Sequence, residues 1–336
     1  MYLQSVAHEW VSLGHHVTIC CAAVDGCPEE ELVGGVRYLR RGGRLSVYRE
    51  ARRYWREHQG DGYELVIDSV NTRPFLTPRF VRGVPVLAIV YQVAREVWYY
   101  ETPLPVAVVG RYLLEPWWLR TYRQTQIVTI SESSRDSLLG YGLRRVEVVE
   151  PGFTSCGTTT GSTKEAEPTL VFVGRLSSNK RPDHALKVFE LVRREIPAAK
   201  MWFIGSGPAE VELRRRAGEN VEFLGRLSDQ ERNERVSRAH LLLVTSSREG
   251  WGLVVTEAAA LGTPAAGYDV PGLRDSLRAS GGLIAPAAPR ALADLVVGLF
   301  REGRITSLRP VPGGVLPWKE VAARVLRVAS AVDIEG

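Results

Sequence analysis

Two glutamates eight residues apart, Glu249 and Glu257, carry the first chemical signal in this 336-residue chain. Between them lies a turn with Gly250 and Gly252, and an apolar helical pattern follows. Glycines at such a turn let backbone N–H groups approach a ligand closely, and a helix N-terminus favours negative charge. A carboxylate in the second turn of that helix, as Glu257 would be, can accept hydrogen bonds from both hydroxyls of a ribose. Two solvated glutamates in a surface loop are the competing interpretation.

Two cations, Arg175 and Lys180, follow a predicted buried strand at residues 169–174. The arginine fork matches phosphate oxygens, and two fixed cations can stabilise the charge that develops on a diphosphate leaving group without a metal ion. Solvated surface charges are the alternative. The six histidines include only one adjacent pair, His15 and His16, and no H-x-x-x-H pattern or carboxylate cluster, so we expect no metal site and no cofactor.

Strand and helix patterns alternate along the chain, which predicts α/β domains with parallel sheets and helices on both faces. Strands are predicted at residues 16–23, 36–39, 65–68, 84–91, 126–131, 146–149, 169–174, 200–204, 221–224, 240–245, 263–268 and 282–285. Helices are predicted at residues 2–13, 46–58, 111–123, 132–140, 181–195, 208–217, 229–238, 253–261, 272–279, 289–302 and 318–332. Sheets of this kind bind ligands beyond the carboxyl ends of their strands, so we expect two such domains to face a cleft.

The chain length suits two domains of about 150 residues each. Residues 154–168 are small and polar, without a large apolar side chain, and are the predicted linker. The expected domains are residues 1–153 and residues 169–316, and residues 317–336 form a terminal helix. A doubly wound domain begins with a central strand, whereas this sequence begins with a helical pattern. We therefore expect the first strand and its glycine-rich turn to be missing from the sequence.

The composition limits which kinds of partner we expect the protein to bind and in which compartment we expect it. The chain has 43 Lys and Arg residues against 38 Asp and Glu residues, a net charge of +5. This mild excess permits an anionic small molecule or an acidic lipid surface, but it is not the basic stripe of a nucleic-acid-binding protein. Four cysteines without a C-x-x-C pair make no disulfide framework, and no run approaches 18 apolar residues. Since no signal-peptide pattern is present, we expect a cytoplasmic protein.

Together these motifs resemble those of the family 4 retaining nucleotide-sugar glycosyltransferases, which have the GT-B fold of two Rossmann-like domains. The matching residues are Gly174, Arg175, Leu176 and Lys180, the Glu249–Glu257 pair, and the run Gly250, Trp251, Gly252 and Leu253, where the family commonly has Gly-Phe-Gly. The resemblance implies transfer of a hexose-type sugar, with retention and without a metal ion, from a nucleotide-diphospho-sugar to a glycan, a lipid-linked acceptor or a small molecule. It also implies that the terminal helix packs on the acceptor-side domain, residues 1–153, while residues 169–316 bind the donor.

The resemblance assigns roles to individual residues. Arg175 and Lys180, beside Gly174, would bind the donor diphosphate, and Glu257 would bind the ribose. Glu249 would contact and position the donor sugar, and with Arg175 and Lys180 it is expected to be catalytic. The phosphates would lie on the backbone amides of Gly250, Trp251, Gly252, Leu253 and Val254. The nucleobase would lie on the backbone of Gly225, Arg226 and Leu227.

Two departures from the family pattern leave a second hypothesis open. Tyr91 stands where family members often have a histidine; a tyrosine can donate a hydrogen bond to a sugar hydroxyl but is a poor base near neutral pH, and a packing role is as reasonable. The second departure is the missing first strand. The alternative to an active enzyme is a catalytically impaired or truncated relative that binds nucleotide or a partner without turnover.

Aromatic residues are concentrated at residues 97–100 and 112–122, near Arg111, Arg120 and Arg123. Aromatic side chains mixed with arginines could rest on the inner surface of a membrane, as a peripheral contact, or stack on a sugar or a lipid-linked acceptor. A helix that covers the core of the first domain is the competing interpretation.

Overall fold

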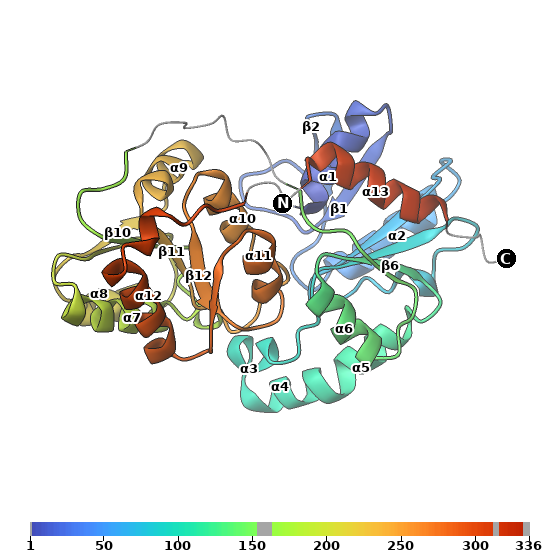
Figure 1. Ribbon diagram of the computed structural model, residues 1–336. Coiled ribbons are helices and arrows are strands. Elements are labelled where there is room, and N and C mark those ends of the chain that lie inside the picture. Colours follow the sequence, from blue (N-terminus) through green and yellow to red (C-terminus); the bar gives the residue numbers. More distant parts are fainter. Residues whose placement is uncertain (1, 153–162, 312–315, 332–336) are drawn as a thin grey trace. The chain divides into compact units, whose positions relative to one another are not determined.

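The computed structural model describes residues 2–152, 163–311 and 316–331 (Figure 1). Contacts divide the chain into two compact units. Unit 1 comprises Met1–Ala94, Val109–Gly152 and Leu316–Gly336, and unit 2 comprises Arg95–Val108 and Phe153–Val315. Each unit contains parallel strands flanked by helices, which confirms the predicted α/β class.

Unit 2 is built on a six-stranded parallel sheet with the strand order β10-β9-β8-β11-β12-β13. The strands are β8 (Thr169–Val173), β9 (Lys200–Ile204), β10 (Val221–Gly225), β11 (Leu241–Val244), β12 (Ala265–Tyr268) and β13 (Leu283–Ala285). The inner strands are continuous apolar runs, such as the fully buried LLLV of β11, because helices cover both faces of a parallel sheet.

The helices of unit 2 match the predicted positions closely from residue 182 onward. They are α7 (Pro182–Glu195), α8 (Glu210–Arg216), α9 (Asp229–Arg238), α10 (Leu253–Ala260), α11 (Leu273–Ala279) and α12 (Pro289–Arg301), with short 3₁₀ turns η3 (Ser178–Lys180) and η4 (Arg304–Thr306). Helices α7 and α12 lie side by side (Figure 1). The unit also contains α3 (Val97–Glu101) and most of α4 (Leu104–Val109), which lie in the stretch assigned by sequence to the first domain.

Unit 1 contains two sheets. The first has the order β1-β3-β2 and the second, which is parallel throughout, has the order β4-β5-β6-β7. The strands are β1 (Val17–Cys21), β2 (Glu30–Val33), β3 (Val36–Arg40), β4 (Val66–Val70), β5 (Val86–Val90), β6 (Gln126–Thr129) and β7 (Val146–Val148). Within the described residues, β1 pairs only with β3, and β4 pairs only with β5.

Strand β2 was not predicted. It pairs antiparallel with β3 through a hairpin whose two turn residues, Gly34 and Gly35, both have positive φ. Two glycines between short strands are a hairpin signal in the sequence, but three of the four β2 residues are exposed, so no apolar pattern marks the strand.

The helices of unit 1 include a long irregular stretch that the sequence predicted only in part. They are α1 (Tyr2–Ser12), α2 (Val47–His58), the π-helical turn η2 (Gly110–Leu114), α5 (Glu115–Arg120), α6 (Glu132–Gly140) and α13 (Trp318–Ser330), with a 3₁₀ turn η1 (Thr77–Arg79). The helix predicted at residues 111–123 is preceded by α4 without a break, so helical structure begins at Leu104. No helix among the described residues is long and apolar enough to cross a membrane.

The terminal helix α13 packs on α1 within unit 1 (Figure 1). The Trp10 indole donates a hydrogen bond to the backbone oxygen of Ala322 at 3.0 Å. Trp318 stands edge-on to Tyr2, with 5.5 Å between ring centroids, and fills the space where a Cβ on Gly152 would lie only 2.7 Å away. Gly152 is therefore the residue that lets the chain pass beneath this tryptophan.

A buried carboxylate organises the loop after β4. The Asp68 side chain accepts hydrogen bonds from the Thr77 amide at 3.1 Å, from the Thr77 hydroxyl at 2.9 Å and from the Tyr122 hydroxyl. The Tyr122 hydroxyl in turn accepts from the Leu76 amide at 2.9 Å. Since buried polar groups need partners, this network fixes the loop to the sheet and to the chain after α5.

The predicted linker lies partly outside the described residues, which omit 153–162. Residues 163–168 pack on unit 2. Lys164 donates hydrogen bonds to the backbone oxygens of Ala239 at 2.7 Å and Gly262 at 3.2 Å, and to the Thr263 hydroxyl at 2.9 Å. Burial lowers the pKa of the Lys164 ammonium to about 8. The composition of this stretch is that of a spacer, but its lysine anchors the chain.

Candidate active site

The predicted donor residues gather at the carboxyl edge of the unit 2 sheet. All six strands are parallel, so the loops that follow them leave the sheet at one edge. The direction of winding reverses at β8, which has β9 on one side and β11 on the other. Open α/β sheets bind ligands at such a reversal. Arg175 and Lys180 follow β8, and Glu249 follows β11.

Three glycines end neighbouring strands at this edge with their backbones in direct contact. The Gly174 amide donates to the backbone oxygen of Ile204 at 2.9 Å, and the Gly205 amide donates to that of Gly225 at 2.7 Å. A Cβ on Gly205 would lie 2.0 Å from the Gly174 oxygen, and all three glycines have positive φ. Gly174 and Gly225 were predicted, whereas Gly205 was missed as a site residue although it stands in the FIGSG segment after β9.

The loops that carry Lys180 and Glu249 are joined along their backbones. The Ser247 amide donates to the Asn179 oxygen at 2.8 Å, and the Thr245 hydroxyl donates to the backbone oxygens of Lys180 at 3.1 Å and Arg181 at 2.8 Å. These contacts fix the 3₁₀ turn η3 against the end of β11. Each loop therefore helps to position the other.

Lys180 and Glu249 form an ion pair across these loops. The Glu249 carboxylate also accepts a hydrogen bond from the Ser246 hydroxyl at 2.6 Å. The lysine is less buried than the glutamate, with side chains 30% and 13% exposed. An ammonium held in this way lies at the sheet edge with donors left for an anion, while the carboxylate is oriented by two partners.

Glu257 lies in helix α10, which begins after Gly252 at a φ of 87°. No side chain caps this helix. The Val255 amide donates to the Gly252 backbone oxygen at 2.9 Å, whereas no partner of the Leu253 and Val254 amides is found among the described residues. Side chains of a helix lean toward its N-terminus, which directs Glu257 back toward residues 251–254. Burial raises the pKa of the Glu257 carboxyl, with Arg232 opposing the rise. No hydrogen bond to this carboxylate is found among the described residues, which leaves its oxygens available to a ligand.

The predicted nucleobase loop, Gly225–Leu227, leads into α9 on the same side. Ser228 and Glu231 cap this helix reciprocally in a capping box. The Arg226 guanidinium donates to the Ser206 hydroxyl at 3.1 Å and so joins the loops after β10 and β9. Arg232 and Asp229 of α9 act on the Glu257 carboxyl electrostatically, so the helix that follows the predicted nucleobase loop lies near the predicted ribose carboxylate.

Unlike Lys180 and Glu249, Arg175 and Trp251 have side chains without a hydrogen-bond or ion-pair partner among the described residues. The Arg175 side chain is exposed, and no ion pair or hydrogen bond to its guanidinium is found within the described residues. Trp251 is buried, and its indole N–H has no hydrogen-bond partner there. Arg175 is thus placed beside the group by its backbone alone, whereas Trp251 packs beneath the turn whose amides were predicted to bind phosphate.

Helix α3 contacts both loops of this group, which sequence reasoning missed. Arg248, whose side chain is 4% exposed, pairs with Glu96 at 3.2 Å. Arg181 donates to the Tyr100 hydroxyl at 2.7 Å, and the Ser178 hydroxyl donates to the Tyr100 backbone oxygen at 3.1 Å. These partners are about 80 to 150 residues apart in the chain, and no local pattern marks such a pair.

Tyr91, the predicted acceptor-side residue, lies in unit 1 directly after β5. Its hydroxyl shares a 3.0 Å hydrogen bond with that of Ser69, and its ring stands edge-on to Tyr2 at 5.9 Å. Burial raises the pKa of the Tyr91 phenol, so the hydroxyl is protonated at neutral pH and cannot act as a base.

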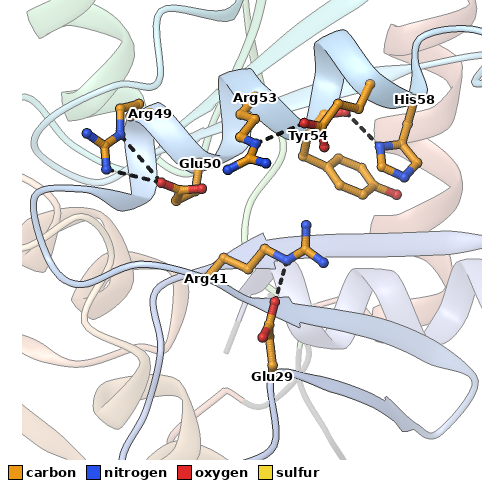
Figure 2. Close-up of polar contacts among 8 residues, drawn as sticks. Glu29, Arg41, Arg49, Glu50, Arg53, Tyr54 and His58 are labelled. Atoms are coloured by element: carbon orange, nitrogen blue, oxygen red, sulfur yellow. Dashed lines mark hydrogen bonds and ion pairs between the residues drawn. The ribbon is translucent and has the colours of Figure 1, made fainter.

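A cavity of about 610 Å³ in unit 1 contains none of the predicted residues. Its lining includes Arg41, Glu50 and Arg53, and Figure 2 shows Arg41 paired with Glu29 and Arg53 paired with its neighbour on α2. The ion-pair distances are 2.7 Å for Arg41–Glu29 and 2.9 Å for Arg53–Glu57. Because these arginines are paired, the cavity offers less positive charge than its composition indicates.

No group of three His, Cys, Asp or Glu side chains that could hold a metal ion is found in the described part of the chain. The described side chains at the sheet edge are cations and two carboxylates, beside a glycine backbone. This set suits an anionic ligand that also carries hydroxyl groups.

Comparison with known proteins identifies the family. Residues 1–154 match the model of Glycosyltransferase Family 4, and residues 160–304 match the model of Glycosyl transferases group 1. The chain belongs to the family 4 glycosyltransferases and has the GT-B fold, which confirms the resemblance seen in the motifs.

Curated relatives match part of the chain. A glycogen synthase of Mycobacterium tuberculosis is 28% identical over 200 residues, which are 56% of this chain and 47% of the relative. A D-inositol 3-phosphate glycosyltransferase of Nocardia farcinica is 32% identical over 175 residues, which are 45% and 39% of the two chains. The matched part of this chain thus spans about half, or less, of the length of these relatives.

Solved structures match almost the whole fold. Sucrose-phosphate synthase from Thermosynechococcus elongatus has a TM-score of 0.76 at 17% identity, over 97% of this chain and 91% of the other. WaaG, a glycosyltransferase involved in lipopolysaccharide biosynthesis, has a TM-score of 0.69 at 16% identity, over 99% and 91%. HepE of Anabaena, solved with UDP and glucose, has a TM-score of 0.63 at 13% identity, over 88% and 86%.

Proposed function

We propose that this protein transfers a hexose-type sugar from a nucleotide-diphospho-sugar to a glycan, lipid-linked or small-molecule acceptor, with retention of configuration and without a metal ion. The convergence of the Lys180–Glu249 pair, Glu257 and the Gly174–Gly205–Gly225 backbone at one edge of the unit 2 sheet carries this proposal. Family membership supports it, as do relatives that are named as glycosyltransferases and a GT-B structure that holds UDP and glucose.

The proposed donor position follows the chemistry of each group. Lys180 and Arg175 neutralise the diphosphate, with the N–H groups at the start of α10 as further donors. Glu257 accepts hydrogen bonds from the ribose hydroxyls, since its carboxylate has no protein partner among the described residues. Glu249, oriented by Lys180 and Ser246, accepts from hydroxyls of the donor sugar. The nucleobase lies against Gly225–Leu227.

The proposed reaction needs no acid or base among these side chains. The acceptor hydroxyl attacks the anomeric carbon on the face from which the nucleoside diphosphate leaves, so the configuration is retained. As the new C–O bond forms, the bond to the phosphate oxygen breaks, and the acceptor proton passes to that oxygen. Positioning and stabilisation of the negative charge on the leaving group supply the rate enhancement. The cytoplasm, where nucleotide sugars are available, is the proposed compartment.

The test begins with donor binding, because the acceptor is not yet identified. UDP-, GDP- and ADP-sugars are each titrated into the protein by calorimetry, and we expect one base to be preferred. Glu257→Gln should weaken that binding, whereas Glu222→Gln, an exposed glutamate of β10, serves as the matched control. If none of the three donors binds, the proposal is wrong.

Transfer is then measured as release of the nucleoside diphosphate with acceptors of each class. We expect release to continue in EDTA and the anomeric configuration of the product to match that of the donor by NMR. Donor binding without release on any acceptor would favour the alternative, a relative that binds nucleotide without turnover.

A further inference from the structure

The helical stretch through η2 and α5 exposes an apolar face on unit 1. Val109, Tyr112, Leu113 and Trp117 are 44%, 60%, 64% and 48% exposed. Val109 and Tyr112 are three residues apart, and Leu113 and Trp117 are four, so these exposed side chains neighbour one another along the helix. Gly110, Glu115 and Leu119 of the same stretch are buried in the unit. The stretch therefore covers the core of unit 1, as one sequence interpretation expected, and it also exposes these four apolar side chains.

Arginines surround this apolar face. Arg111 lies beside Tyr112, with its guanidinium carbon 5.3 Å from the ring centroid, and Arg79 of η1 lies 4.4 Å from the ring of Trp117. Arg120 and Arg123 follow in the chain and are exposed.

Negative charge is nearly absent from the same stretch. Residues 104–123 contain a single acidic residue, Glu115, against three arginines. Glu115 is turned inward, where it accepts hydrogen bonds from the Ala94 amide at 2.6 Å and the Tyr141 hydroxyl at 3.3 Å. The exposed charge of the stretch is therefore positive.

We propose that the face formed by Val109, Tyr112, Leu113 and Trp117, with its surrounding arginines, binds an anionic lipid surface. Aromatic and aliphatic side chains enter the region between headgroups and acyl chains, while arginines remain at the phosphates. A surface of negatively charged headgroups satisfies both halves of this composition. A protein partner would need acidic residues around an apolar groove. Association with a second copy of this chain is therefore tested as the alternative outcome. The inference does not depend on the proposed transferase activity.

The experiment is sedimentation of the full chain with vesicles, in the absence of nucleotide sugar. Vesicles of phosphatidylcholine alone are compared with vesicles that contain ~30 mol % phosphatidylglycerol, which is enough to give a clearly negative surface potential. We expect binding to the anionic vesicles that weakens as salt is raised, and little binding to the neutral ones.

Two variants separate the apolar and charged contributions. Leu113→Gln/Trp117→Gln should reduce partitioning by at least about tenfold, because two large apolar side chains no longer enter the bilayer. Arg111→Gln/Arg120→Gln should reduce the preference for anionic vesicles by about fivefold for each arginine. The control is Leu32→Gln/Leu45→Gln, which removes two leucines elsewhere in unit 1 that are even more exposed than Leu113 and Trp117.

Leu113 and Trp117 are both exposed, so we expect the Leu113→Gln/Trp117→Gln variant to unfold at the same temperature as the parent, which circular dichroism checks. Equal sedimentation of this variant and the parent would overturn the proposal, as would failure of the parent to bind anionic vesicles. A parent dimer that dissociates in the Leu113/Trp117 variant, measured by light scattering, would assign the face to a second copy and would also overturn it.

Discussion

Lys180 and Glu249 are 69 residues apart in the chain, yet they form an ion pair at the carboxyl edge of one sheet. The pair depends on two loops that are joined by a backbone hydrogen bond from Ser247 to Asn179 and by one from the Thr245 hydroxyl to the Arg181 backbone oxygen. A partly exposed ammonium beside an oriented carboxylate can bind a phosphate and a sugar hydroxyl at neighbouring points. The geometry therefore supports assigning both residues to one ligand.

Replacement of Lys180 by alanine should lower transfer by about a hundredfold, because a fixed donor to the leaving diphosphate is lost. Release of nucleoside diphosphate under saturating donor measures the effect. Lys187→Ala is the control, since Lys187 is an exposed lysine of α7 whose partner is Glu190. In the double variant Lys180→Ala/Glu249→Gln the losses should be less than additive, because the two residues act as a pair. A twofold effect of Lys180→Ala would remove it from the site.

Glu257→Gln should separate ligand binding from stability. The amide offers one acceptor oxygen in place of a carboxylate, so we expect donor affinity to fall by about tenfold or more, given the strength of hydrogen bonds to charged groups. In the parent, donor binding should weaken as the pH falls through the raised pKa of Glu257. Binding by the variant should lack this dependence, which calorimetry between pH 4 and pH 8 checks.

The same change should raise the stability of the ligand-free chain at neutral pH. A folded-state pKa above the unfolded value means that the folded chain binds more protons in the interval between the two. The free energy of unfolding therefore falls as the pH rises through that interval, and the desolvation cost of the charged carboxylate is present above it. The variant should melt at a higher temperature than the parent at pH 7, and at pH 4 the difference should vanish. A variant that melts lower at pH 7 would show that Glu257 is stabilising.

The sequence predicted most elements of the fold because their apolar runs are regular. The buried runs of β8, β9 and β11 and the helical patterns of α7 and α12 were all located to within a few residues. The errors lie where the apolar sequence pattern does not determine the local structure. Helix α3 was missed, since distant partners contact it: Arg248 pairs with Glu96 at its N-cap, and Arg181 donates to the Tyr100 hydroxyl. The start of α4 was missed as well.

The candidate site was predicted from motif spacing, and the structure adds what spacing does not contain. Gly205 and Gly272 have no side chain and no ligand chemistry of their own, so only the close approach of two backbones reveals their importance. The Ser246 hydrogen bond to Glu249 is likewise set by the turn after β11. Residue types thus predicted candidate side chains that the structure places at one sheet edge, whereas the contacts that orient these side chains required the folded chain.

Lys164→Ala should destabilise unit 2 although the residue stands in a stretch with the composition of a linker. Its ammonium donates to three oxygens, and their loss should cost about 1.5–3 kcal/mol, the range for a hydrogen-bonded charged group. Thermal unfolding of the full chain measures this. Lys319→Ala, in the first turn of α13, is the control because this lysine is exposed. Equal melting temperatures for Lys164→Ala and the parent would show that residues 163–168 are a passive spacer.

Gly272→Ala should impair catalysis through the position of Glu249 without touching the ligand. A Cβ at residue 272 would lie 2.0 Å from the Glu249 backbone oxygen and 2.8 Å from that of Gly250, so the site turn has to move. The φ of Gly272 is 76°, which adds strain to any replacement. Gly262→Ala is a matched control, because Gly262 has a φ of 75° but open space around its Cβ position.

Both variants carry the backbone strain, of about 1 kcal/mol, and only Gly272→Ala carries the displacement. We therefore expect a similar fall in melting temperature from strain in both, with a loss of transfer of about tenfold or more confined to Gly272→Ala, since misplacement by about 1 Å has effects of this order or larger. Equal transfer by the two variants would show that the backbone at Glu249 tolerates displacement, and that its carboxylate does not need the fixed position that the Lys180 pair indicates.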